Sequence, residues 1–149
     1  MKYIRKSIKQ DISRIAEILV FTKRMSYRSI FKNDIISFKE MQVLSLAKEY
    51  LEDTSKLKNI WVYDDELVKG LINIEQKEIK ELYVDYFFEN QGIGAYLMDF
   101  AKKEFDINHL WVLEKNQGAI AFYKKSGFLM TEERKLEEGT IEYIVKMVR

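Results

Sequence analysis

The chain has 149 residues, of which 47% are hydrophobic and 13% aromatic, so it suits one domain (1–149) with a buried core and is too short for two ordinary domains. Its 25 Lys and Arg residues balance 24 Asp and Glu residues without a long block of either sign, which argues against nucleic acid as a partner. There is no Cys and a single His, His109, which excludes disulfides, a Cys nucleophile, and metal sites built from thiolates or several histidines.

The N-terminal residues lack the apolar core of a signal peptide, and no hydrophobic run is long enough to span a bilayer. We therefore expect a cytoplasmic protein with no membrane partner. Residues Lys2–Ser7 alternate as a first strand, and Asp11 is a candidate cap for a helix that follows. The apolar face of that helix is formed by Ile12, Ile15, Ala16 and Leu19.

Two segments follow before the first hairpin. Met25–Asn33 has no clean period, so a short helix and a loop both remain open. Ser37–Glu40 is a capping box, which predicts a helix that continues through Leu51.

The middle of the chain predicts antiparallel strands. Ile60–Tyr63 and Leu67–Ile74 flank the polar turn Asp64–Glu66, and Gln76 and Lys77 turn the chain into a further strand that ends at Val84. Within the second strand, Gly70 indicates a bulge or a close neighbour, although an incidental glycine is an equal alternative.

A glycine-rich turn between that strand and the next helix is the most informative stretch. The helix begins near Ile93, and Gly92 and Gly94 let backbone N–H groups approach a ligand without a Cβ in the way. Such a terminus favours an anion, above all a phosphate. A nucleoside-triphosphate loop would need Lys and Ser or Thr after its last glycine, and the dinucleotide fingerprint would need a third glycine where Leu97 stands. A plain tight turn remains the alternative.

The last third of the chain predicts a second βα unit. His109–Leu113 reads as a buried strand, and because a helix connects it to the strand ending at Val84, the two strands should run parallel. Asn116–Tyr123 begins a helix closed by Ser126 and Gly127, and two final strands surround Glu138 and Gly139. These elements predict a single-domain α/β fold with a mixed sheet.

Two motifs together resemble those of the GNAT superfamily of acetyl-CoA-dependent N-acetyltransferases. The first is Leu82–Val84 followed by Gln91–Gly94, and the second is Trp111–Asn116 followed by Ala119, Phe122–Tyr123 and Gly127–Phe128. The resemblance implies a mostly antiparallel sheet flanked by helices, with a central parallel strand pair that splays to hold the cofactor.

The resemblance also implies which residues bind acetyl-CoA. Leu82, Tyr83 and Val84 would contact the pantetheine arm, Asn116 the arm or thioester, and Tyr123 the sulfur. The diphosphate would lie on Glu89, Asn90, Gln91, Gly92, Ile93, Gly94 and Ala95. Two positions depart from the family pattern. Tyr86 stands where Pro is frequent, which should affect only the stiffness of the loop. Glu89 stands where Gln or Arg is usual, and its carboxylate would repel a diphosphate. We expect this side chain to turn outward.

The predicted reaction is direct attack of a primary amine, from a small molecule or a peptide, on the thioester. Glu78, where some GNAT enzymes carry a catalytic Glu, and Glu81 are the candidate bases, and alternation along one strand would place them on opposite faces. Each is also readily explained as a solvated strand carboxylate. Tyr123 is the candidate general acid, with core packing as its alternative role. A non-catalytic acyl-CoA-binding domain, a nucleotide-binding module and a homodimer remain open.

Overall fold

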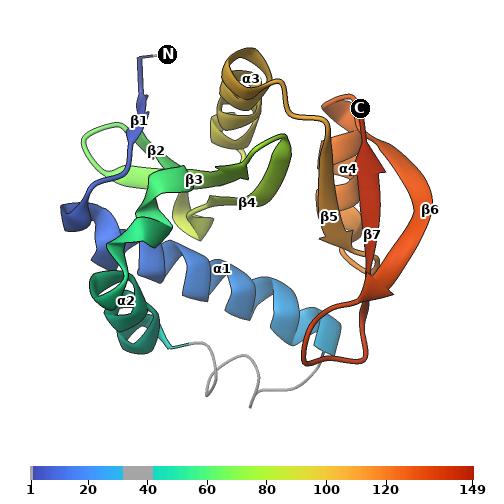
Figure 1. Ribbon diagram of the computed structural model, residues 1–149, viewed down its shortest axis with the longest axis horizontal. Coiled ribbons are helices and arrows are strands. Elements are labelled where there is room, and N and C mark those ends of the chain that lie inside the picture. The colour runs from blue at the N-terminus through green and yellow to red at the C-terminus, as the bar shows by residue number, and fades with distance from the viewer. Residues whose placement is uncertain (1, 32–41) are drawn as a thin grey trace.

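The computed structural model describes residues 2–31 and 42–149, and in this part of the chain seven strands form one sheet flanked by helices (Figure 1). The order across the sheet is β1-β2-β3-β4-β5-β7-β6. The strands are β1 (Ile4–Lys6), β2 (Ile60–Asp64), β3 (Val68–Glu75), β4 (Glu78–Val84), β5 (His109–Leu113), β6 (Leu129–Leu136) and β7 (Tyr143–Val148). All neighbouring strands are antiparallel except β4 and β5, which are parallel, so the predicted mixed sheet is confirmed.

Four α-helices and three short 3-10 turns accompany these strands in the described residues. The helices are α1 (Ile12–Phe31), α2 (Val43–Glu52), α3 (Ile93–Phe105) and α4 (Gln117–Lys125), and the turns are η1 (Lys9–Asp11), η3 (Thr54–Asn59) and η4 (Tyr86–Phe88). The helical alternative for Met25–Asn33 is confirmed as far as Phe31. The capping box at Ser37–Glu40 lies outside the described residues, and α2 begins only at Val43, after an extended Gln42.

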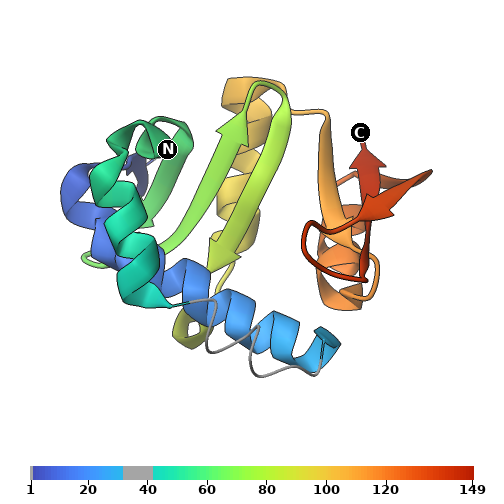
Figure 2. The same cartoon turned by 60° about the horizontal axis from the view of Figure 1, so that its bottom comes forward.

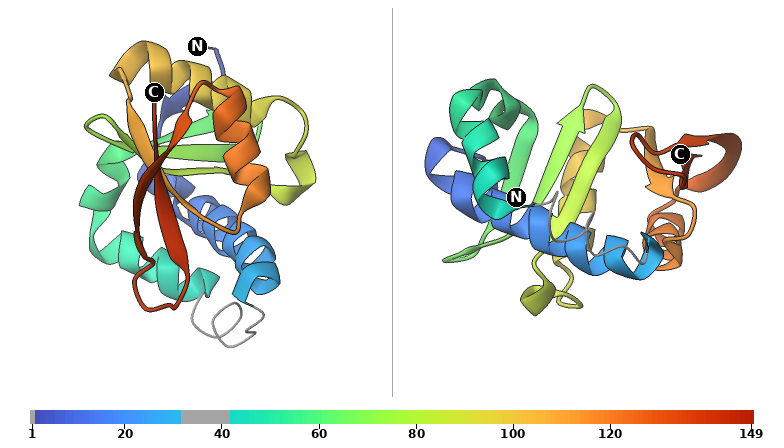
Figure 3. Two further views of the ribbon diagram at one scale, coloured as in Figure 1. Left: turned by 90° about the vertical axis from the view of Figure 1, so that its right-hand side faces the viewer. Right: turned by 90° about the horizontal axis from the view of Figure 1, so that it is seen from below.

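Each face of the sheet has its own apolar core. On one face, α1 and α2 bury Ile15, Leu19 and Tyr50 against Val62 and Leu71. On the other face, α3 and α4 lie against β3, β4, β5 and β7, as Figure 3 shows from two further directions. This second core includes Ile72, Ile74, Ile79, Leu97, Leu110, Ile120 and Phe128.

Gly70 lies in β3 beneath the start of α3, next to a shift in the β2–β3 register between Tyr63 and Asp64. A Cβ at Gly70 would approach the Tyr83 carbonyl oxygen to 3.1 Å and the Ile93 side chain to 3.2 Å. Both distances are tighter than ordinary contacts, so Gly70 lets α3 pack closely on the sheet, as the close-neighbour interpretation predicts.

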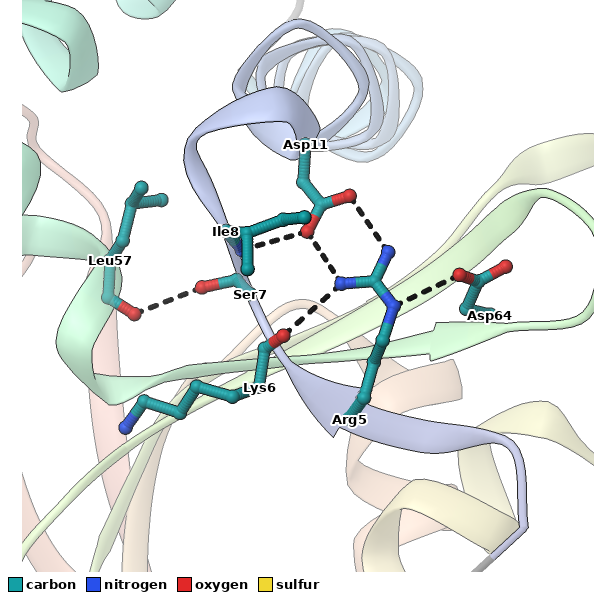
Figure 4. Close-up of polar contacts among 7 residues, drawn as sticks. All are labelled: Arg5, Lys6, Ser7, Ile8, Asp11, Leu57 and Asp64. Carbon is teal, nitrogen blue, oxygen red and sulfur yellow. Dashed lines mark hydrogen bonds and ion pairs between the residues drawn. The ribbon is translucent and has the colours of Figure 1, made fainter.

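The start of α1 is fastened to the sheet by Arg5 (Figure 4). Its guanidinium donates to both carboxylate oxygens of Asp11, at 2.8 and 2.9 Å, and to Asp64 at 2.9 Å. The prediction that Asp11 caps the helix ahead of it is wrong. The 3-10 turn η1 begins at Lys9, so Asp11 is its third residue. The Asp11 carboxylate accepts a hydrogen bond from the preceding Ile8 N–H at 2.8 Å.

A β-bulge at Lys80 changes the faces of β4. Asn73 pairs with Glu81 and Ile74 pairs with Ile79, so Lys80 has no partner on β3. Because residues paired across a ladder lie on the same face, Glu75 and Glu78 share a face with Asn73 and Glu81. The prediction that Glu78 and Glu81 lie on opposite faces is therefore wrong, because the extra residue Lys80 shifts the alternation of side chains between the two faces by one position.

Candidate active site

The two parallel strands pair over a short length and then separate. Only Glu78 with His109 and Ile79 with Leu110 are paired, although β4 continues to Val84 and β5 to Leu113. The divergence is visible in Figure 2, where β4 and β5 open toward their C-terminal ends. From Glu81 to Val84, no strand of the described structure pairs with β4 on the side of β5, and this stretch contains the predicted arm-binding residues Leu82, Tyr83 and Val84.

The N-terminus of α3 lies beyond the end of β4. Gly92 is its N-cap, with a φ of +84°, which L side chains rarely adopt. Among the described residues no side chain caps this terminus, so the first N–H groups of the helix, from Ile93 to Ala95, have no intrahelical acceptor. The structure therefore places backbone donors and the positive end of a helix dipole beside the C-terminal end of β4, where β4 and β5 have separated.

Gly94 lies between α4 and the end of β4. A Cβ at Gly94 would stand 3.5 Å from the Phe122 ring on α4 and 3.9 Å from the Val84 side chain on β4. Both are ordinary van der Waals distances, but a larger branched side chain would fill the space between these elements. We define Glu89–Ala95 as the glycine turn.

Within the glycine turn, Glu89, Asn90 and Gln91 are exposed, and Asn90 has a positive φ of 63°. Partial burial and the nearby Asp85 charge raise the pKa of the Glu89 carboxyl. Asp85 itself accepts from the Phe87 N–H at 2.8 Å and pairs with Arg14. Glu89 thus turns outward, as expected, but it keeps a like-charged neighbour.

Asn116 and Tyr123 stand at the start of α4 and along it. The Asn116 side chain caps the helix, with its Oδ1 accepting from the Ala119 N–H at 3.2 Å, so its amide N–H groups are the part available to a ligand. The Tyr123 ring is half-buried and packs against Phe122 and Phe128, with ring centroids 5.4 and 6.1 Å away. Burial raises the pKa of the Tyr123 phenol to about 12, so this hydroxyl keeps its proton at neutral pH.

The two candidate bases have different surroundings although they share a face. Glu78 lies on the paired rung of β4 and β5, where its carboxylate is 3.2 Å from His109 Nε2 and 3.4 Å from Lys80 Nζ. It is therefore at the closed end of the strand pair. Glu81 lies beyond the last paired rung, at the start of the opening.

Glu81 belongs to a polar group that the sequence patterns did not single out. Asn73 Nδ2 donates to its Oε1 at 3.2 Å, and Lys23 Nζ lies 3.5 Å from its Oε2. Burial, followed by the charges of Glu81 and Glu49, raises the pKa of Tyr50 to about 12. The one available signal was Asn73 itself, a polar residue within the apolar run Leu71–Ile74.

The described residues hold no cluster of three or more His, Asp or Glu side chains arranged for a metal ion. Nor does any helix within residues 2–31 and 42–149 have both the length and the apolar character needed to cross a bilayer.

Solved structures with this fold cover nearly the whole chain. The apo form of YjaB from Escherichia coli superposes with a TM-score of 0.72 at 23% identity, covering 97% of this chain and 95% of that one. The PaiA N-acetyltransferase from Thermoplasma acidophilum, solved in complex with coenzyme A, has a TM-score of 0.68 at 23% identity and covers 96% of both chains. At these identities, the likeness shows the shared fold.

Comparison of sequences identifies the family, whereas the structural likeness shows the fold alone. An uncharacterised N-acetyltransferase of Methanocaldococcus jannaschii is 39% identical over an 83-residue alignment, with coverage of 50% of this chain and 35% of that protein. The chain thus aligns with about a third of the length of this curated relative. The model of the acetyltransferase (GNAT) domain matches residues 24–148. Because this match covers most of the sequence, the chain belongs to the GNAT acetyltransferase family.

Proposed function

We propose that this protein is an N-acetyltransferase that moves the acetyl group of acetyl-CoA to a primary amine of a small molecule or peptide. The observation that supports this most is the opening between β4 and β5, which has the uncapped N-terminus of α3 at its mouth. An elongated ligand with a diphosphate near one end suits such a site, because a strand edge and a helix terminus both offer backbone donors.

The residues at the opening fit coenzyme A. The glycine turn would hold the diphosphate through backbone N–H groups, helped by the Asn90 and Gln91 side chains. The edge of β4 that faces β5, at Leu82, Tyr83 and Val84, would pair with the pantetheine arm, and Asn116 would donate to the arm from α4. A Cβ at Gly92 would meet no protein atom within 4 Å, so the space beside it is open to a ligand. Acetyl-CoA bound there supplies an acyl group activated as a thioester.

Tyr123 is assigned as the general acid. Its pKa of about 12 keeps the proton on Oη at neutral pH, and a thiol has an ordinary pKa near 8.5. The phenol can therefore donate to a departing thiolate sulfur without first being ionised by the solvent.

Glu81 is assigned as the group that receives the amine. A primary amine with a pKa near 10.4 is mostly protonated at pH 7, which withholds roughly 4–5 kcal/mol of reactivity until the proton is removed. Glu81 lies at the start of the opening, whereas Glu78 is at the closed end and bound to His109. We therefore assign to Glu81 the attraction of the ammonium group and the acceptance of its proton.

Release of free thiol from acetyl-CoA across a panel of primary amines tests this function. Amine-dependent thiol release and the matching acetylated amine are the expected products. Binding of coenzyme A without release for any amine would instead indicate the non-catalytic acyl-CoA-binding alternative. Stabilisation by ATP or NAD in preference to coenzyme A would indicate a nucleotide-binding module.

A further inference from the structure

The polar group around Glu81 carries information about the acceptor. It lies on the face of the sheet that α1 crosses (Figure 2), and α1 packs against both β3 and β4. The α3 terminus, which would hold the cofactor, packs on the opposite face. An acceptor that enters from the α1 side would therefore meet Glu81, Asn73 and Lys23 without displacing the cofactor.

One acceptor atom in this group is left without a donor. Asn73 Oδ1 is buried and has no hydrogen-bond partner in the described structure, while its Nδ2 is committed to Glu81. A buried carbonyl oxygen without a donor costs stability. An ammonium group placed between Asn73 Oδ1 and the Glu81 carboxylate would satisfy both acceptors.

The described side chains of this group carry balanced charges. Glu81 contributes one negative charge and Lys23 one positive charge, with side-chain exposures of 20% and 30%. A simple cationic amine would pair with Glu81 and leave Lys23 with an uncompensated charge in a half-buried site, which is costly. An acceptor that carries an anionic group beside its amine would pair with both.

We propose that the acceptor is a small zwitterion, with a carboxylate adjacent to the primary amine as in a free α-amino acid. Glu81 and Asn73 bind its ammonium group, and Lys23 leaves Glu81 to bind its carboxylate. This assignment rests on the proposed function, and it narrows the acceptor from any primary amine to one chemical class.

The test uses sets of three acceptors with the same side chain: an α-amino acid, its α-carboxamide and the decarboxylated amine. Each set is assayed with the wild-type protein, Lys23→Met and Lys23→Arg. The three amines differ in intrinsic basicity, so the decisive quantity is the change between protein variants for each acceptor. Calorimetric titration of the same acceptors into the protein saturated with coenzyme A gives a second readout that needs no turnover.

We expect Lys23→Met to lower kcat/KM for the amino acid by roughly 10- to 100-fold, the range for a lost charged hydrogen bond, and to raise its dissociation constant by a similar factor. The amide and the decarboxylated amine should change less than about threefold, and Lys23→Arg should retain the preference.

The contrary outcomes separate the two proposals. If all three acceptors are affected equally, or improve when Lys23 is removed, then Lys23 only occupies Glu81 and the zwitterion assignment fails while acetyl transfer stands. If no acceptor is acetylated but the amino acid binds selectively through Lys23, the group binds a zwitterion as proposed and the proposed activity fails. Absence of any selective binding of amino acids overturns the assignment, whether or not acetyl transfer occurs.

Discussion

Tyr123 has two proposed roles, packing through its ring and proton donation through its hydroxyl, and removal of the hydroxyl alone separates them. Tyr123→Phe keeps the ring contacts with Phe122 and Phe128 and removes only the hydroxyl. We expect turnover with acetyl-CoA to fall roughly 10²-fold or more, the scale of a lost general acid, with coenzyme A affinity and Tm nearly unchanged.

Tyr63→Phe is the matched control, because Tyr63 contributes its ring to a separate aromatic group with Tyr3 and Tyr96. Its turnover should stay within a few-fold of wild type. Turnover of Tyr123→Phe in that same range would show that the phenol is structural. Because the pKa of Tyr123 is about 12, ionisation of this phenol should not limit the rate below about pH 11.

The charge of Glu89 should affect coenzyme A binding. Its raised pKa, caused by partial burial and by Asp85, indicates that its negative charge is disfavoured even before a diphosphate arrives. Glu89→Gln should therefore strengthen coenzyme A binding, most visibly at low salt, where charges are least screened. Titration calorimetry at two ionic strengths measures this, and an unchanged or weaker affinity would assign Glu89 a favourable role in binding.

Among the elements, the N-terminus of α3 should govern cofactor binding. Coenzyme A is expected to raise the Tm of the wild-type protein because it binds only the folded state. Gly92→Val should abolish this increase, since its side chain would enter the space beside the turn and its φ of +84° is unfavourable for valine.

Gly139→Val separates the ligand effect from backbone strain. Gly139 has a comparable φ of +76° and equally open surroundings, but it lies in the turn between β6 and β7. Both variants should lose stability, and only the Gly92 variant should lose its response to coenzyme A. A normal response from a folded Gly92→Val protein would mean that the diphosphate binds elsewhere.

The attachment of α1 should depend on pH through Asp11. Burial alone would raise the pKa of Asp11, but the hydrogen bonds from Arg5 and the Ile8 N–H outweigh it and lower the pKa below its ordinary value. A carboxyl with a lowered folded-state pKa stabilises the fold above its unfolded-state pKa of about 3.9, and this contribution is lost as pH falls through the folded-state value.

Asp11→Asn should therefore lower the Tm at pH 7, by about 4–8 °C if about 2 kcal/mol is lost, and the difference from wild type should shrink below about pH 4. Thermal melts across this range measure both effects. Asp64→Asn removes the other, more exposed partner of Arg5 and should cost less. An Asp11→Asn deficit that persists undiminished to pH 2 would exclude the ion pair as its cause.

The features that could be predicted from the sequence are those determined by residues close together in the chain. The hairpin, the helix that starts after Gly92 and the crossover to His109–Leu113 depend on neighbouring residues, and they are confirmed. The bulge at Lys80 depends on how β4 aligns with β3, which alternation along one strand cannot show. The approach of Lys23 to Glu81 depends on how α1 packs over the sheet, and so it too was missed.

At the scale of the whole molecule, the sheet consists of two groups of strands joined at its centre. Strands β1 to β4 form one group and β5, β7 and β6 the other, and the two paired rungs at Glu78 and Ile79 are their only β-ladder connection in the described structure. A ligand that pairs with β4 beyond Ile79, on the side of β5, would add contacts where this ladder has ended.

Hydrogen exchange provides the measurement. Addition of coenzyme A should slow the exchange of backbone amides in residues 81–84 of β4, while β2, which is paired on both sides, should change little. Equal slowing in both strands would indicate a global gain of stability and would leave the strand edge unassigned.

The short connection at the centre of the sheet has a consequence for how long the protein survives in a cell. Proteases cleave chains in their transiently opened states, and when opening is fast, the rate of cleavage follows the population of those states. If the two strand groups separate more readily without a ligand bridging them, the unliganded chain should be degraded faster. The abundance of this protein would then rise and fall with the supply of acetyl-CoA, without any change in its synthesis.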